Sequence, residues 1–387
     1  MRAFVFTDKA LAKQAGRFVW LEIDTEKAQN APLRSQLSVK ALPTYFVVDP
    51  DSERIALRWV GGATVPQLEK ILDDGRLAVT GEARPEKGSA QAAADGALAR
   101  AERLFGAARH AEAAAAYREA LSRAPENWPR YGRAVESLLF ALQETDSTEE
   151  AAKRARDAFP KLASTPSAAN VAATGLDCAL RLPAENPRRE ALVRELEADA
   201  RRVVDDPQVP VAADDRSGVF IALLDARKKA KDEPGTREIA SRWAAFLEGE
   251  AERARTPEER TVFDSHRLSS YIELGEPERA VPMLEASERD LPHDYNPPAR
   301  LAVAFKAMKQ WDRALAASDR AVEKAYGPRK LGILQARSDI YLGLGDVPAS
   351  RRTLEEALQL AESLPEEQRS KSTLASLRKK LEALPQP

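Results

Sequence analysis

The hydrophobic pattern of the chain changes once along its length. In the first 75 residues, short apolar runs rich in β-branched and aromatic residues alternate with polar turns, as is typical of strands. From about Ala92 to the end, apolar positions recur with the 3.6-residue period of amphipathic helices, and strand signals disappear. The pattern therefore predicts an α/β region followed by an all-α region.

Three strands are expected in the first region, over residues 17–24, 44–49 and 54–60, and the sequence PDSE predicts a turn between the last two. Helices are predicted before the first strand, between the first and second, and after the third. Thr64 is expected to cap the last of these helices, with Pro66 in its first turn. The predicted order is helix, strand, helix, strand, strand, helix.

A polar stretch containing Gly81 and Pro85 follows, and it is predicted to be a linker over residues 76–91. A length of 387 residues is more than one compact core usually needs. We therefore expect an N-terminal domain over residues 1–75 and a helical domain over residues 92–387. The helical domain should hold fourteen or fifteen antiparallel helices and no sheet.

Small residues recur near the C-terminus at an almost constant spacing. Ala280, Ala314 and Ser350 are 34 and 36 residues apart, and Gly275 and Gly345 precede two of them. A small residue where two helices cross lets their backbones approach closely, and glycine allows the chain to turn between them. The spacing predicts stacked helical hairpins.

This period and order of residues resemble tetratricopeptide repeats, most clearly over residues 97–125 and 262–363. The helices between these ranges are expected to continue the same solenoid with irregular hairpins. The resemblance implies a protein or peptide partner, because some repeats of this family hold a partner's acidic C-terminus with basic residues on the first helix of each hairpin. For the arginines, a solvated surface position is the favoured interpretation, and the tyrosines would then pack as knobs between helices. The candidate partner-binding residues are Arg267, Tyr271, Tyr295, Arg300, Arg337 and Tyr341.

The sequence VKALPTYFVVDP, the hairpin after it and the sequence GGATVPQLEKIL resemble the second half of a thioredoxin fold. In that family the matching strand begins with a cis-proline, which here corresponds to Pro43. The resemblance implies a cis Leu42–Pro43 peptide bond and a substrate-binding role for Leu42, Pro43 and Thr44 beside an extended polypeptide. A trans proline that opens a strand is the alternative.

The chain departs from that family in two ways. No C-x-x-C motif precedes the predicted strand 17–24, and the family's central strand is missing. Without that strand, residues 17–24 and 44–49 lose their shared neighbour and leave backbone unpaired, so we expect the N-terminal domain to be the less stable one. The favoured explanation is that Met1 is an internal methionine of a longer thiol–disulfide oxidoreductase. The other is a degenerate domain retained as a cap.

Composition narrows the range of partners. The 59 basic and 61 acidic residues nearly balance, which gives no electrostatic reason to expect nucleic acid or an anionic membrane surface. No apolar run approaches the roughly 18 residues that span a bilayer. The start MRAFVFTDK is too short to be a secretory signal, so the chain as written is expected in the cytoplasm. A preceding secretory signal would instead place it in the periplasm.

The residues that carry chemistry are few. Cys178 is the one cysteine, which excludes an internal disulfide, and its apolar surroundings predict a buried thiol. His110, His266 and His293 are widely separated, and no metal or cofactor is predicted. Disulfide exchange needs two cysteines, so the chain as written is expected to lack it. Three classes of function remain: part of a redox enzyme with a partner-binding solenoid, a redox-inactive binding protein, and a structural scaffold.

Overall fold

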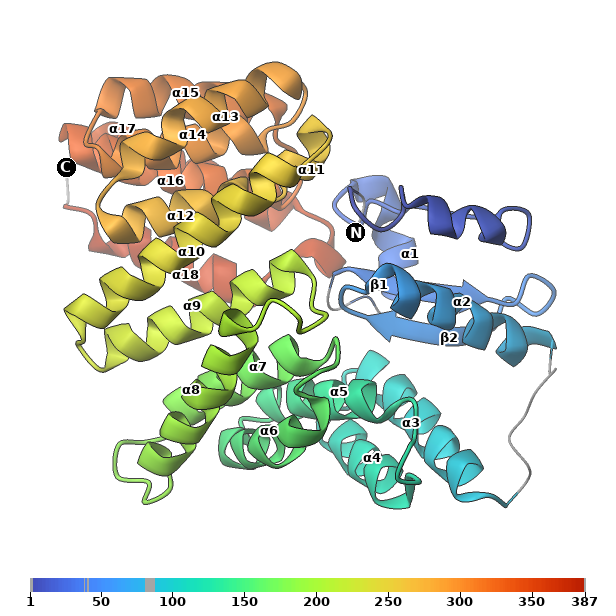
Figure 1. Cartoon of the computed structure of the whole chain (residues 1–387). Coiled ribbons are helices and arrows are strands. Elements are labelled where there is room, and N and C mark those ends of the chain that lie inside the picture. The colour runs from blue at the N-terminus through green and yellow to red at the C-terminus, as the bar shows by residue number, and fades with distance from the viewer. Residues whose placement is uncertain (1–2, 38, 40–41, 81–87, 386–387) are drawn as a thin grey trace. The chain divides into compact units, whose positions relative to one another are not determined.

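A computed structural model of the chain describes residues 3–37, 39, 42–80 and 88–385, which are largely helical (Figure 1). Strands β1 (Thr44–Val48) and β2 (Ile55–Val60) form a two-stranded sheet. The 3-10 helices are η1 (Lys9–Gln14), η2 (Ala28–Asn30), η3 (Pro277–Arg279) and η4 (Glu366–Gln368). The α-helices are α1 (Ala31–Gln36), α2 (Val65–Thr80), α3 (Ala90–Gly106), α4 (His110–Arg123), α5 (Tyr131–Gln143), α6 (Thr148–Leu162), α7 (Ala168–Leu180), α8 (Arg189–Asp205), α9 (Ala213–Lys229), α10 (Glu233–Arg253), α11 (Pro257–Thr261), α12 (Asp264–Leu274), α13 (Ala280–Asp290), α14 (Asn296–Ala307), α15 (Trp311–Lys324), α16 (Arg329–Leu344), α17 (Val347–Ser363) and α18 (Lys371–Ala383).

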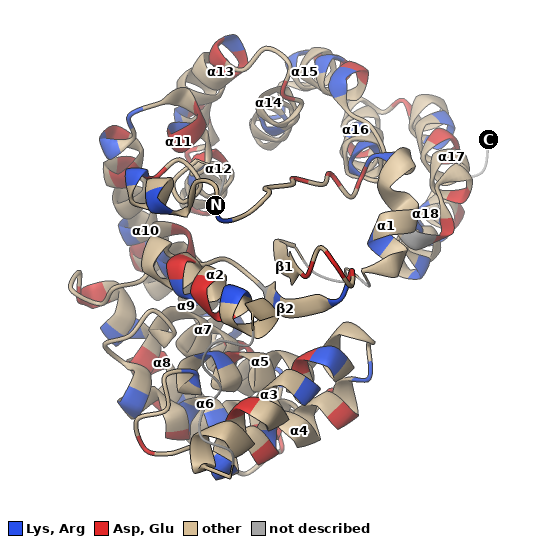
Figure 2. Ribbon diagram, turned by 90° about the vertical axis from the view of Figure 1, so that its right-hand side faces the viewer, with Lys and Arg blue, Asp and Glu red and all other residues tan. Residues whose placement is uncertain are grey.

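The predicted change from a mixed region to helices is present in the structure. After β2 the described residues form helices without further strands, and α3 to α18 are sixteen helices where fourteen or fifteen were expected. Basic and acidic residues are interspersed along these helices (Figure 2). This mixture is what the near-balance of charges in the sequence predicts for solvated helix faces.

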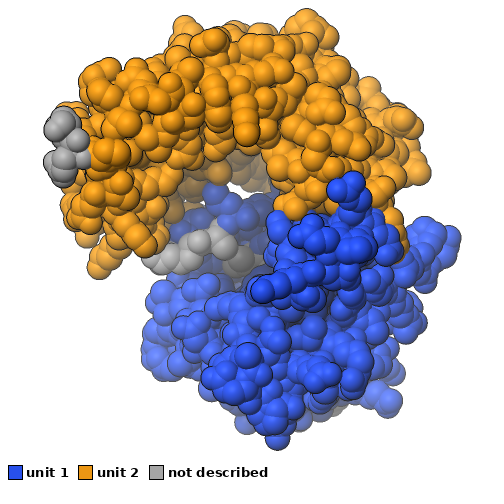
Figure 3. Space-filling view, turned by 90° about the vertical axis from the view of Figure 1, so that its left-hand side faces the viewer, with its two compact units in different colours: residues 1–15, 38–239 blue, residues 16–37, 240–387 orange. Residues whose placement is uncertain are grey.

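The chain forms two compact units, which Figure 3 colours separately. Unit 1 comprises residues 1–15 and 38–239, and unit 2 comprises residues 16–37 and 240–387. The segment 16–37 therefore packs with the C-terminal helices, although it lies in the predicted N-terminal domain. The predicted linker also differs in part, because α2 continues through residues 76–80, and residues 81–87 lie outside the described part of the chain.

The prediction of a strand over residues 17–24 is wrong. These residues have irregular backbone, and Val19 and Leu21 are 90% and 81% exposed. A strand needs a neighbour to pair its backbone and to bury alternate side chains, and among the described residues only β1 and β2 pair with each other. The helix predicted after this segment is also reduced, to η2 and α1.

The hairpin predicted from strands 44–49 and 54–60 is confirmed. β1 and β2 are antiparallel, with Thr44 opposite Val60, and the turn between them is closed by Asp49, whose Oδ2 accepts a hydrogen bond from the Ser52 hydroxyl at 2.6 Å. The Leu42–Pro43 peptide bond before β1 is cis, the isomer expected from the sequence. This hairpin and α2 are shared with the predicted fold, but a two-stranded sheet does not by itself make a thioredoxin fold.

The predicted start of α2 is also confirmed. The backbone N–H of Thr64 donates to Gln67 Oε1 at 2.8 Å, and the N–H of Gln67 donates to Thr64 Oγ1 at 3.4 Å. This reciprocal arrangement is a capping box, which satisfies two backbone donors at the start of the helix.

Six of the described helix connections share one turn geometry. In each, a residue with φ between 53° and 80° follows the first helix, and the next N–H donates to the carbonyl oxygen five positions earlier, at 2.8 to 3.0 Å. This is the Schellman motif, which ends one helix and turns the chain sharply toward the next. The positive-φ residues are Ala108, Asp146, Lys231, Gly275, Lys309 and Gly345.

Lys309→Gly should raise the free energy of unfolding by about 1 kcal/mol. A non-glycine residue in the left-handed region costs about 1–2 kcal/mol, and glycine removes this cost. Part of the gain is offset because glycine gives the unfolded chain more conformational entropy. Lys309 is exposed with φ of 57°, so its replacement removes little packing. Urea-induced unfolding measures the change. Lys309→Ala keeps the Cβ and serves as the control, with no gain expected. Equal stabilities of the glycine variant and the wild type would contradict the strain at this position.

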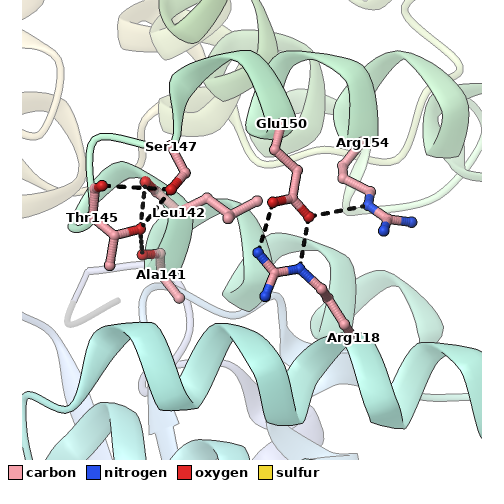
Figure 4. Close-up of polar contacts among 7 residues, drawn as sticks. All are labelled: Arg118, Ala141, Leu142, Thr145, Ser147, Glu150 and Arg154. Atoms are coloured by element: carbon pink, nitrogen blue, oxygen red, sulfur yellow. Dashed lines mark hydrogen bonds and ion pairs between the residues drawn. The ribbon is translucent and has the colours of Figure 1, made fainter.

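Polar contacts between side chains about one hairpin apart show that the hairpins repeat. In unit 1, Arg118 on α4 makes a bidentate contact of 2.6 and 2.7 Å with Glu150 on α6, and Glu150 also lies 3.6 Å from Arg154 (Figure 4). Figure 4 also shows the α5–α6 turn, where Thr145 Oγ1 contacts the Leu142 carbonyl at 3.1 Å.

Contacts with sequence separations of 31 to 34 within a unit are Asp95–Trp128, Glu102–Arg133, Glu136–Asn170, Gln143–Asp177, Glu248–Arg279, Glu288–Arg320 and Lys306–Asp339. Equivalent helices of successive hairpins therefore lie side by side, as in a helical-repeat array.

The small residues predicted at helix crossings lie in the core of unit 2. Ala280, Ala314 and Ser350 are each 0% exposed. The hydroxyl oxygens of Ser338 on α16 and Ser350 on α17 are 2.7 Å apart, so the two helices meet through small side chains. The predicted register of the C-terminal hairpins is confirmed at these positions.

Candidate functional site

Two arginine–tyrosine pairs predicted as partner-binding residues lie at equivalent places on α12 and α16. Arg267 Nη2 donates to Tyr271 Oη at 3.3 Å, and Arg337 Nη2 donates to Tyr341 Oη at 2.9 Å. Each pair has the i, i+4 spacing that places side chains together on one helix face. The pairs are 70 residues apart, since 337 minus 267 is 70, which corresponds to two hairpins.

The surroundings of the two pairs differ. Tyr271 is 2% exposed, and its hydroxyl donates to Glu248 Oε1 at 2.7 Å. Tyr341 is only partly buried, and Arg337 also pairs with Asp319. The Tyr271 ring is thus largely committed to packing within unit 2, whereas part of Tyr341 is open to a partner.

Arg300 and Arg267 help to balance a buried carboxylate that the sequence analysis missed. Asp264 is 0% exposed, and its Oδ2 accepts a hydrogen bond from the Ser287 hydroxyl at 2.7 Å. Burial raises the pKa of Asp264, while the Ser287 hydrogen bond and the charges of Arg300 and Arg267 oppose that rise. Burial also lowers the pKa of Arg300, which donates weakly to the Thr261 carbonyl at 3.4 Å. The charges of these arginines are therefore partly used inside the unit.

Tyr295 lies at a different place, next to a segment from the other end of the chain. It precedes α14, and the charges of Arg329 and Glu26 both act on its hydroxyl, whose pKa is raised chiefly by burial. Glu26 and Arg329 form an ion pair with 2.5 Å between Oε1 and Nε. Asp24 Oδ2 accepts a hydrogen bond from the Tyr326 hydroxyl at 2.6 Å. No pattern in the sequence connects residues separated by about three hundred positions.

The residues predicted to bind an extended substrate lie at the start of β1 in unit 1. Leu42 is 57% exposed, the Pro43 carbonyl accepts the Gly61 N–H at 2.9 Å, and Thr44 is the first residue of the strand. The exposed Leu42 side chain leaves apolar surface beside the strand.

Unit 1 also contains a cavity of about 630 Å³ between β2, α2, α3 and the loops before α5 and α7. The Arg133 guanidinium stacks 3.8 Å from the centroid of the Trp59 ring and donates to the Arg58 carbonyl at 3.0 Å. Arg130 forms an ion pair of 2.8 Å with Asp95. The volume lies in the range of small-molecule sites, but Arg130 already pairs with Asp95, and Arg133 already pairs with Glu102. The cavity was not predictable, because packing brings together residues scattered over about a hundred positions.

The lone thiol is buried, as predicted. Cys178 on α7 is 0% exposed, and burial raises its pKa to about 12. A thiol with this pKa has almost no thiolate at neutral pH and is not a nucleophile. Within the described part of the chain, the helices are too short or too polar for any of them to cross a bilayer.

No protein-family model matches the chain, and no curated protein matches it. Among solved structures, a tetratricopeptide repeat protein from Parabacteroides merdae ATCC 43184 is 11% identical, covers 75% of this chain and 99% of its own, and superposes with a TM-score of 0.47. The TPR2AB domain of yeast Sti1 in complex with pHSP90 is 15% identical over 75% of this chain and 97% of its own, with a TM-score of 0.29. Yeast Tom70 is 11% identical over 75% of this chain and 88% of its own, with a TM-score of 0.22. The structural neighbours of this mostly helical chain are tetratricopeptide repeat proteins, and at these TM-scores its hairpin architecture rests on its own turns and contacts.

Proposed function

We propose that the chain is a protein-interaction scaffold whose helical hairpins bind a protein or peptide partner. The observation that carries the proposal is the repetition of hairpins with side-chain contacts 31 to 34 residues apart in both units. Such arrays offer extended surfaces on which equivalent positions of successive repeats meet one partner. The proposed partner-binding residues lie on or directly before α12, α14 and α16, each the first helix of a hairpin in unit 2. They are Arg267, Tyr271, Tyr295, Arg300, Arg337 and Tyr341.

Within this set, Arg337 and Tyr341 are the residues on which we base the test. The Arg337 guanidinium lies 5.2 Å from the centroid of the Tyr341 ring and donates to its hydroxyl, which fixes the orientation of its fork. A guanidinium held in one orientation loses less side-chain entropy when it binds a carboxylate. A partner's acidic C-terminus would have to replace the contact of Arg337 with Asp319, whose side chain is more than half exposed.

The N-terminal part is proposed to be thioredoxin-like and redox-inactive in this chain. The sequence around Pro43 and the order of β1, β2 and α2 support the likeness. The buried lone thiol of Cys178 opposes redox activity, because exchange needs an accessible thiolate and a resolving cysteine. The competing proposal is that these residues complete an oxidoreductase whose cysteine pair belongs to a preceding segment.

The chain as given should not accelerate insulin reduction by dithiothreitol, and acceleration that is lost in Cys178→Ser would contradict its proposed inactivity.

Fluorescence anisotropy with a labelled eight-residue peptide tests the binding function. The peptide ends in four acidic residues and a free carboxylate, and it should bind the whole chain. Arg337→Ala should weaken this binding at least tenfold, because the carboxylate loses its bidentate donor. Arg352→Ala removes the same charge from an exposed position on α17 and should leave the affinity unchanged. Equal affinities of the two variants would count against the proposed face, and absence of binding to the wild type would count against an acidic C-terminus as the ligand.

A further inference from the structure

Within unit 2, the segment Asp24–Glu26 lies against residues 326–368 in the manner of a bound peptide. Thr25 is 9% exposed, whereas Ile23 before the segment and Lys27 after it are exposed. The three residues thus form a short anchored stretch between two solvated flanks. Two of the three are acidic.

Each residue of the segment contacts a specific side chain from the C-terminal part of unit 2. The Tyr326 hydroxyl donates to Asp24 Oδ2 at 2.6 Å, and Arg329 pairs with Glu26 at 2.5 Å. Between them, the side-chain amide of Gln368 donates to the Thr25 carbonyl at 3.1 Å. Gln368 is only 6% exposed with the segment in place, so its amide donor lies in the contact and not in solvent. Together, these groups contact the backbone as well as both carboxylates.

The backbone at Gly327 allows residues 24–26 to come very close. A Cβ on Gly327 would lie 2.6 Å from the Glu26 carbonyl oxygen, so only glycine allows the segment to come this close. Gly327 also has φ of 56°, a conformation that glycine adopts without strain. Glu26 lies beside Arg329, the first residue of the 16-residue helix α16, where the helix dipole favours negative charge.

We propose that Tyr326, Gly327, Arg329 and Gln368 form a binding site for an extended acidic peptide of the pattern Asp-x-Glu, and that residues 24–26 occupy this site in cis. The inference rests on the proposed function and names the chemistry of one partner. A partner bearing such a segment replaces residues 24–26, which then leave the surface together with their flanks. Because the tethered segment acts at a high effective concentration, the intact chain binds a free peptide weakly.

The test uses the full chain and a fluorescent peptide with the sequence of residues 22–29, acetylated and amidated at its ends. Asp24→Asn combined with Glu26→Gln removes both carboxylates from the cis segment and should raise the affinity for the peptide at least tenfold over the wild type. Adding Arg329→Ala to this double variant should remove the gain. Adding Lys330→Ala instead removes the same charge one residue further along α16 and should preserve it. A peptide carrying Asn and Gln in place of Asp and Glu should bind to none of the variants.

Trypsin cleavage after Lys27 gives a second readout that needs no added peptide. The anchored segment protects this bond in the wild type, and both the double variant and Gly327→Ala should be cleaved at least tenfold faster there. Circular dichroism of each variant checks that unit 2 remains folded. Equal peptide affinity of the wild type and the double variant, or equal cleavage rates, would overturn cis occupancy. If the peptide with an acidic C-terminus binds through Arg337 while the internal peptide does not bind the double variant, the inference fails and the proposed function stands.

Discussion

Ala314→Leu should lower the free energy of unfolding by about 2–3 kcal/mol, because the added atoms have no space to enter. Ala314 is 0% exposed and belongs to one buried cluster with Ala280, Leu284, Phe305 and Ile340. These neighbours come from helices α13, α14 and α16, so a larger side chain on α15 must separate several helices at once. The cost therefore includes lost contacts across the whole cluster as well as local strain.

Ala316→Leu provides the matched control, since Ala316 lies on the same helix α15 and is exposed. The two variants share helix propensity and added volume and differ only in the face of the helix that they change. Ala316→Leu should change the free energy of unfolding by less than about 0.5 kcal/mol. Urea-induced unfolding followed by circular dichroism compares them, and a neutral Ala314→Leu would show that the small residues do not set the distance between helices.

The hairpin register was predictable because its signal is local and repeated. Ala280, Ala314 and Ser350 each occupy a crossing where only a small side chain fits, so the packing constraint itself appears in the sequence as a period. Of the turns between helices, those with a glycine could be predicted from the sequence and those without one could not. Gly275 and Gly345 indicate a left-handed residue, but Lys309 has the same conformation and gives no such signal.

The failures have a different physical origin. Residues 17–24 have the composition of a strand, but a strand is stable only with a partner, and propensity says nothing about whether one is present. The contacts of Asp24 and Glu26 with Tyr326 and Arg329 depend on where a distant segment packs. Sequence patterns report on neighbours along the chain, so a site made by the two ends of the chain appears only in the structure.

Glu136→Gln should make unit 1 less sensitive to pH. Burial, together with the nearby charge of Asp215, raises the pKa of the Glu136 carboxyl to about 7, although Ser167, Arg133 and Asn170 act in the opposite direction. Asn170 Nδ2 donates to Glu136 Oε2 at 3.4 Å, a long bond that stabilises the ionised form only weakly. The folded state therefore favours the neutral carboxylic acid.

The sign of the pH dependence follows from the two pKa values. The carboxyl ionises near 4.5 in the unfolded chain and near 7 in the folded one, so the folded state binds more protons between these values. The free energy of unfolding should fall as the pH rises from 4.5 to 7 and then level off for this group. Burial raises the pKa of Asp215 to about 6, which adds to the same trend in the wild type.

A glutamine at this position is neutral at every pH and keeps the shape of the protonated side chain. Glu136→Gln should therefore match the wild type near pH 4.5 and exceed its free energy of unfolding by about 1–3 kcal/mol at pH 8. Urea-induced unfolding at both pH values measures the difference. Glu126→Gln, at an exposed position before α5, is the control and should leave the pH dependence as it is. The Glu136 variant could instead keep the full wild-type dependence of the free energy of unfolding on pH. In that case the Glu136 carboxyl would ionise in the folded protein much as it does in water, and its burial would carry no electrostatic cost.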